Sequence, residues 1–67
     1  MKLVINGETA EAPDGTAVTE LLKLRRVSQP DMVTVELNGE ILDRKTFDKT
    51  FLREGDRVEF LYFMGGG

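Results

Sequence analysis

Two Asn-Gly dipeptides, Asn6-Gly7 and Asn38-Gly39, constrain the fold of this chain more than any other feature of its sequence. Each one lies between short segments rich in β-branched and other apolar residues. A type I′ turn needs positive φ at both central residues, and Asn followed by Gly adopts those angles with little steric strain. The sequence therefore predicts two β-hairpins, one in each half of the chain.

The predicted hairpins join residues 2–6 to residues 8–12, and residues 32–37 to a short segment around residues 41–42. Alternate residues of a strand face the same side of a sheet. We therefore expect these apolar side chains to face a common core: Met1, Leu3, Ile5, Val33, Val35 and Leu37.

Between the hairpins, residues 16–26 carry the spacing of a helix. Val18, Leu21 and Leu22 stand at i, i+3 and i+4, which places them on one helical face. Thr16 precedes this run, and threonine is a common N-cap residue. The pattern predicts one amphipathic helix that is capped by Thr16.

Three cations, Lys23, Arg25 and Arg26, fall in the last turn of that helix. They admit two interpretations, an anion-binding site or a solvated helix end at which cations interact favourably with the helix dipole. The second interpretation is the one that we favour from the sequence.

Residues 43–52 hold Phe47 and Phe51, four positions apart, which suggests a helical or 3₁₀ turn that places both rings in the core. A turn at residues 53–56 then leads into a last strand at residues 57–63. The resulting order is ββαββ, a short helical turn and β. It predicts an α+β fold in which one main helix packs on a small mixed sheet of four to five strands.

In the last strand, Val58 and Phe60 are assigned to the helix-facing side, with Tyr62 at the edge. Leu61 and Phe63 then stand on the opposite face, which Glu59 marks as solvated. The outer face of an antiparallel sheet is usually polar, so large apolar side chains there indicate a surface that binds a partner. Two alternatives stay open from the sequence: the alternation is misassigned and both side chains lie in the core, or single exposed apolar side chains have no functional meaning.

Composition excludes several classes of function. The 67 residues include no Cys and no His, so a thiol nucleophile, an imidazole general base and zinc–thiolate or other metal sites are not expected. A net charge of −3 argues against a nucleic-acid partner. The sequence shows neither a membrane-spanning run nor a signal peptide, so we expect a cytoplasmic protein. We also expect the chain to be monomeric when free. Turn, cap or solvated positions, rather than acid–base catalysis, are predicted for the remaining carboxylates: Asp14, Asp43, Asp48, Glu54 and Asp56.

The chain ends in Gly65-Gly66-Gly67, which cannot contribute to a core. We therefore divide the chain into a folded domain at residues 1–64 and a flexible tail at residues 65–67. A glycine thread can enter a channel too narrow for side chains, and its tip carries the α-carboxylate of Gly67. A carboxylate is a poor electrophile, but it becomes reactive once ATP converts it to an acyl-adenylate.

Several segments of the chain match a known family pattern: 4–8 (VINGE), 16–18 (TAV), 21–22 (LL), 33–41 (VTVELNGEI), 55–59 (GDRVE) and the terminal Gly66-Gly67. By these segments the chain resembles the ThiS family of ubiquitin-like β-grasp sulfur carriers that serve bacterial thiamine biosynthesis. The resemblance covers essentially the full length, although Ala17 stands where the family often has a cap residue, and Ala10 and Ala12 are smaller than usual.

The resemblance implies a carrier and co-substrate rather than an enzyme. An E1-like adenylyltransferase would use ATP and Mg²⁺ to adenylate Gly67, and this chain itself would bind no cofactor. Sulfur from a cysteine desulfurase persulfide would then give a Gly67 thiocarboxylate, which thiazole synthase would accept while building the thiamine thiazole. Gly65 and Gly66 would thread into the partners' active sites, and the apolar docking residues would be Leu61, Phe63 and Met64.

Other interpretations remain open from the sequence. Related β-grasp carriers deliver sulfur to molybdopterin, tRNA thiolation or cysteine synthesis, and ubiquitin-like modifiers use the same terminal chemistry. From another class, the chain could be a plain β-grasp binding module with an incidental tail. Removal of Gly66 and Gly67 separates these classes, because a binding module would keep its partner and its role.

Overall fold

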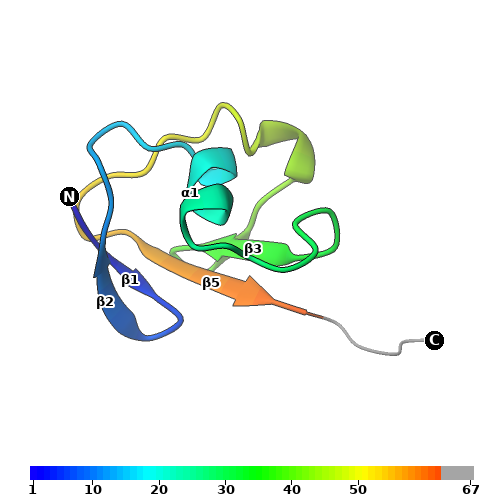
Figure 1. The fold of residues 1–67 in the computed structure, drawn as a ribbon, viewed down its shortest axis with the longest axis horizontal. Helices are drawn as coiled ribbons and strands as arrows, with labels where there is room; N and C mark the ends of the chain where they lie inside the picture. The colour runs from blue at the N-terminus through cyan, green and yellow to red at the C-terminus, as the bar shows by residue number, and fades with distance from the viewer. Residues whose placement is uncertain (63–67) are drawn as a thin grey trace.

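The computed structural model describes residues 1–62, which form one mixed sheet with a single α-helix against it (Figure 1). The sheet order is β2-β1-β5-β3-β4, with β1 and β5 parallel and all other neighbours antiparallel. The elements are β1 (Lys2–Ile5), β2 (Glu8–Glu11), α1 (Val18–Leu24), β3 (Thr34–Leu37), β4 (Glu40–Ile41), the 3₁₀ turn η1 (Arg44–Thr46) and β5 (Arg57–Leu61). The predicted fold class and element order are confirmed. The predicted domain boundary at residue 64 lies outside the described residues.

Both Asn-Gly turns adopt the predicted conformation. The φ angles are 49° and 83° at Asn6 and Gly7, and 52° and 88° at Asn38 and Gly39. The two-residue turns fix the pairing of Ile5 with Glu8 and, in the second hairpin, of residue 37 with residue 40. Register set in this way determines which side chains reach the core.

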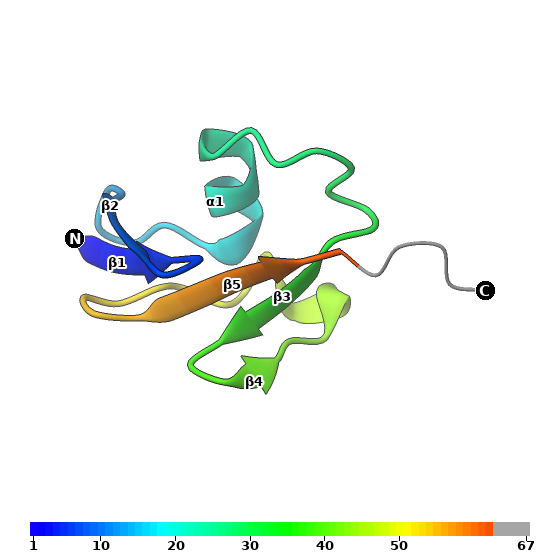
Figure 2. The same ribbon diagram turned by 90° about the horizontal axis from the view of Figure 1, so that it is seen from below.

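The core lies between α1 and one face of the sheet (Figure 2). Val18, Leu21 and Leu22 of α1 are buried, as the helical spacing predicts. The strands contribute Leu3, Ile5, Val35 and Val58, all buried, and Val33 is buried just before β3. Met1, Leu37 and Phe60 are partly buried against this core. Each fully buried aliphatic side chain contributes roughly 1.5–3 kcal/mol, so this layer is the main source of stability.

The predicted N-cap at Thr16 is wrong, and α1 is shorter than the predicted residues 16–26. The N-cap is Ala17, and the Thr16 hydroxyl instead donates to the Pro13 carbonyl at 2.6 Å. Two other hydrogen bonds take over part of the capping role. The Val18 N–H donates to the carbonyl of the distant residue Thr50 at 3.0 Å, and within α1 Glu20 Oε1 accepts from the Ala17 N–H at 3.1 Å. A tertiary contact thus satisfies a helix-end donor that a cap side chain often satisfies.

The prediction that Phe47 and Phe51 both enter the core is half wrong. Phe47 is buried at 5% exposure, whereas Phe51 is 60% exposed. The helical turn η1 ends before residue 48, and Phe51 lies in extended chain that forms an isolated bridge with Ala17. Alternation along extended chain points Phe51 outward and places Leu52 in the core at 3% exposure.

Candidate functional site

The last described part of β5 leads into the predicted tail. Leu61 pairs with Thr34 of β3, is half-buried, and lies on the sheet face opposite α1, as predicted. Tyr62 follows the strand, and its phenol O–H donates to the Ser28 carbonyl at 2.9 Å. The other predicted site residues lie outside the described residues: Phe63, Met64, Gly65, Gly66 and Gly67.

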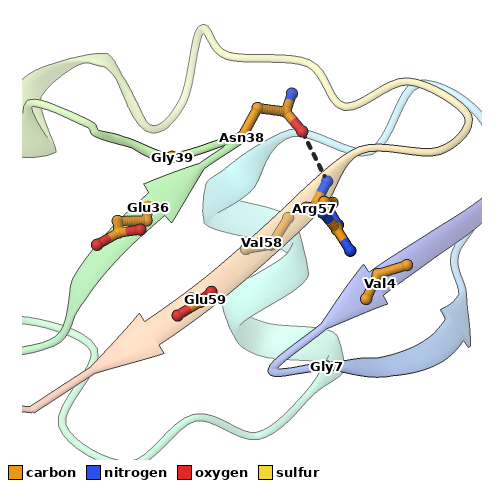
Figure 3. Close-up of a pocket in the computed structure, with 8 residues that line it drawn as sticks. All are labelled: Val4, Gly7, Glu36, Asn38, Gly39, Arg57, Val58 and Glu59. Carbon is orange, nitrogen blue, oxygen red and sulfur yellow. Dashed lines mark hydrogen bonds between the residues drawn. The ribbon is translucent and has the colours of Figure 1, made fainter.

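Both turn asparagines anchor β5 through their side chains. Asn6 Oδ1 accepts from the Phe60 N–H at 2.8 Å, and Asn38 Oδ1 accepts from the Arg57 N–H at 2.9 Å (Figure 3). Asn38 Nδ2 also donates to Asp56 Oδ1 at 3.0 Å. The strand that leads to the C-terminal residues is therefore held from both sides by side chains whose sequence signal indicated only a turn.

An open groove of about 460 Å³, which we call the outer groove, crosses the sheet face opposite α1. Figure 3 views this face with α1 behind the sheet. Glu36 of β3 and Glu59 of β5 are direct cross-strand partners in it. Like charges placed opposite each other destabilise a sheet, so this pair does not serve stability.

Ile41 is an apolar residue of the outer face that the sequence analysis did not separate from Leu42. It pairs with Glu36 and is 65% exposed, whereas Leu42 is half-buried against the core. The sequence did contain the information needed to separate the two residues, because the Asn38-Gly39 turn fixes the register of the second hairpin. Once Leu37 points inward, residue 41 must point outward.

The carboxylates occupy structural positions, as predicted. Asp43 accepts from the Lys45 N–H at 2.9 Å, Glu54 from the Lys2 N–H at 2.8 Å, and Asp56 from the Arg53 N–H at 2.8 Å. Asp14 pairs with the N-terminal ammonium at 3.2 Å, and Asp48 is exposed. Within residues 1–62, no group of three or more potential ligands is placed to hold a metal ion.

The cations at the end of α1, Lys23, Arg25 and Arg26, are all exposed. Lys23 and Arg26 line a second groove together with Arg44, a residue that the sequence analysis did not single out. No helix in the described part of the chain is long and apolar enough to cross a membrane.

Comparison with known proteins supports the resemblance to the ThiS family that the sequence indicates. A model of the ThiS family matches residues 3–67. The crystal structure of the thiamine biosynthesis protein ThiS from Geobacter metallireducens superimposes with a TM-score of 0.93, at 52% identity and full coverage of both chains. The solution structure of a thiamine biosynthesis protein from the same organism gives a TM-score of 0.80 at 54% identity, covering all of this chain and 88% of the other.

Two curated relatives are larger proteins. Each is named thiazole synthase, one from Magnetococcus marinus and one from Paramagnetospirillum magneticum, and each is 37% identical over 67 residues. The match covers all of this chain but only 20% of either relative. An uncharacterized protein, ycf40 of Porphyra purpurea, is 25% identical over 67 residues that span 93% of its length.

Residues 1–62 form one α-helix on a five-stranded mixed sheet in which β1 and β5 are parallel neighbours, and this arrangement defines a β-grasp domain. The family match and the structural match both name ThiS, which is a narrower group than the β-grasp fold. The chain belongs to the ThiS family.

Proposed function

We propose that this chain is a sulfur carrier whose Gly67 carboxylate is activated and converted to a thiocarboxylate for thiamine thiazole formation. The observation that carries the proposal is the ThiS family match, which extends to residue 67 and so includes the terminal glycines. The structural match at 52% identity to a thiamine biosynthesis protein supports the same pathway. In this role the chain is a co-substrate, and partner enzymes perform the chemistry.

The proposed chemistry needs no side chain of this protein. A Gly67 carboxylate oxygen attacks the α-phosphorus of ATP, the bond to pyrophosphate breaks, and an acyl-adenylate forms. The terminal sulfur of a desulfurase persulfide then attacks the acyl carbon and AMP leaves. A thiol reductant supplies two electrons that break the resulting S–S bond and leave the thiocarboxylate. ATP and Mg²⁺ bind to the adenylyltransferase.

Thiazole synthase is the proposed sulfur acceptor. The support is that a segment similar to this entire chain forms part of two proteins that bear that name. The adenylyltransferase and the desulfurase are required by the chemistry. Leu61, Phe63 and Met64 are proposed as the apolar residues that dock these partners, with Gly65 and Gly66 threading toward the reacting carbon.

Intact-mass spectrometry tests this function directly. The chain is incubated with a ThiS-family adenylyltransferase, ATP, a desulfurase, cysteine and a thiol. We expect a mass increase equal to the replacement of one oxygen by sulfur, located at Gly67 by fragmentation. A chain that ends at Gly65 is the matched control and should not change. An unchanged mass with a partner that thiolates its own carrier contradicts the proposal.

A further inference from the structure

A second groove, which we call the basic groove, is lined by residues of α1, of the loop that joins α1 to β3, and of the segment that begins with η1. Figure 1 shows how the backbone of these segments is arranged. Its volume is about 480 Å³. Leu22 and Phe47 form part of an apolar floor, and three exposed cations stand on the rim, Lys23, Arg26 and Arg44. The groove is thus a positively charged site on a chain whose net charge is −3.

Arg26 occupies a backbone position that favours glycine. Its φ is 52°, its N–H donates to the Lys23 carbonyl at 3.1 Å, and the Val27 N–H donates to the Leu22 carbonyl at 3.0 Å. These two bonds define a Schellman motif, whose left-handed residue is usually Gly. A charged side chain thus stands at a position where a residue other than glycine has a strained backbone, and strain of this kind often occurs at functional positions.

Arg44 is a fixed charge on the same rim. Its guanidinium donates to the carbonyls of Pro30 at 2.6 Å and Val33 at 2.5 Å, and it lies 5.3 Å from the centroid of the Phe47 ring. Five N–H donors are available on a guanidinium, so some remain for a further acceptor. A cation already held in place loses little conformational freedom when it binds an anion.

We propose that the basic groove is a docking site for a segment of a partner protein that presents an Asp or Glu carboxylate beside an apolar side chain. Charge complementarity supports an acidic occupant, since Asp31 is the single acid among the groove residues. The apolar floor favours an apolar neighbour over a free inorganic anion. The helix C-terminus itself disfavours anions, so the attraction comes from the three side chains.

A titration followed by NMR tests the groove without any tail chemistry, so its outcome is separate from that of the proposed function. The full chain, labelled with ¹⁵N, is titrated with a short peptide of alternating leucine and glutamate. We expect saturable shifts at the amides of Leu22, Val27 and Phe47. The same peptide with lysine in place of glutamate should bind at least about tenfold more weakly. Phosphate should give no saturable shift.

Arg26→Gly separates binding from folding. Glycine relieves the positive-φ strain, so the melting temperature should rise, while peptide affinity should fall at least about fivefold because a rim charge is lost. Arg25→Gln is the matched control, since it removes a neighbouring charge that does not line the groove. It should leave affinity within about twofold.

Three results would overturn the proposal. They are the absence of saturable shifts with the acidic peptide, an equal loss of affinity in Arg25→Gln and Arg26→Gly, and saturation by phosphate at the same amides. The last result would assign the rim to a free anion rather than to a protein segment.

Discussion

At the residue scale, Asn6 and Asn38 each have two structural roles, one of the backbone and one of the side chain. Each adopts positive φ, and each uses its amide oxygen to accept a hydrogen bond from a β5 backbone N–H. Glycine could adopt the positive φ, but it has no side chain to accept the hydrogen bond. Replacement by glycine keeps the turn conformation and removes the anchor, while the relief of positive φ and the added freedom of the unfolded chain act in opposite directions.

Asn6→Gly should destabilise the chain by about 1 kcal/mol, the typical net value of one intramolecular hydrogen bond, because the Phe60 N–H loses its acceptor. Urea denaturation measures this change. Asn6→Asp is the control, since it keeps an oxygen at the same position and should lose less. If Asn6→Gly is as stable as the parent chain, the side-chain anchor has no energetic role.

At the element scale, the extended segment around Phe51 and Leu52 explains how a short helix is stabilised. The Thr50 carbonyl of this segment accepts a hydrogen bond from the Val18 N–H, and the Leu52 N–H donates to the Thr16 carbonyl at 2.9 Å. An isolated helix of this length is not stable in water, so α1 depends on this segment and on the sheet.

The two phenylalanines of this region should respond oppositely to truncation. Phe47→Ala should cost about 3–5 kcal/mol because it leaves a cavity in the core, a loss large enough to unfold much of a chain of this size. Phe51→Ala should change stability by less than about 0.5 kcal/mol because its ring is already in solvent. Thermal unfolding of both variants measures the contrast, and equal destabilisation would contradict the assignment of Leu52, rather than Phe51, to the core.

Local patterns predicted most of the fold because they depend on neighbours in sequence. The Asn-Gly turns, the alternation in β1 and β3 and the apolar face of α1 are of this kind. Thr16 and Phe51 were mispredicted because tertiary contacts decided them: Thr50 supplies the acceptor at the helix start, and the bridge to Ala17 sets the direction of the Phe51 side chain.

The same division holds for the candidate site: its local pattern was predictable from the sequence, and its tertiary contacts were not. Alternation placed Leu61 on the outer face correctly. The bond from Tyr62 to Ser28 joins residues 34 positions apart, and it depends on the path of a loop that no local pattern specifies. The contribution of Arg44 to the basic groove was missed for the same reason, because its carbonyl partners lie in that loop.

At the scale of the whole molecule, the outer face of the sheet and the basic groove beside α1 are separate surfaces formed by residues 1–62. They involve different residues, so a change on one need not disturb the other. Partners that use the C-terminal residues are proposed to dock on the outer face, close to Leu61.

Leu61→Asp should weaken binding to the adenylyltransferase at least about tenfold, or about 1.4 kcal/mol, because it places a charge in the proposed apolar contact. Isothermal titration calorimetry measures the dissociation constant, and circular dichroism checks the fold. Thr9→Asp adds the same charge to the outer face of β2, away from β5, and should have little effect. Binding that is unchanged in Leu61→Asp would exclude this residue from the interface.

The central position of β5 also has a mechanical consequence. The strand runs parallel to β1 and antiparallel to β3, with ladder bonds on both sides. A force applied along β5 through the C-terminus would load these ladders in shear, so that many bonds must yield together rather than one after another. An enzyme that applies force to the C-terminus would therefore pull on a strand that is hydrogen-bonded on both edges.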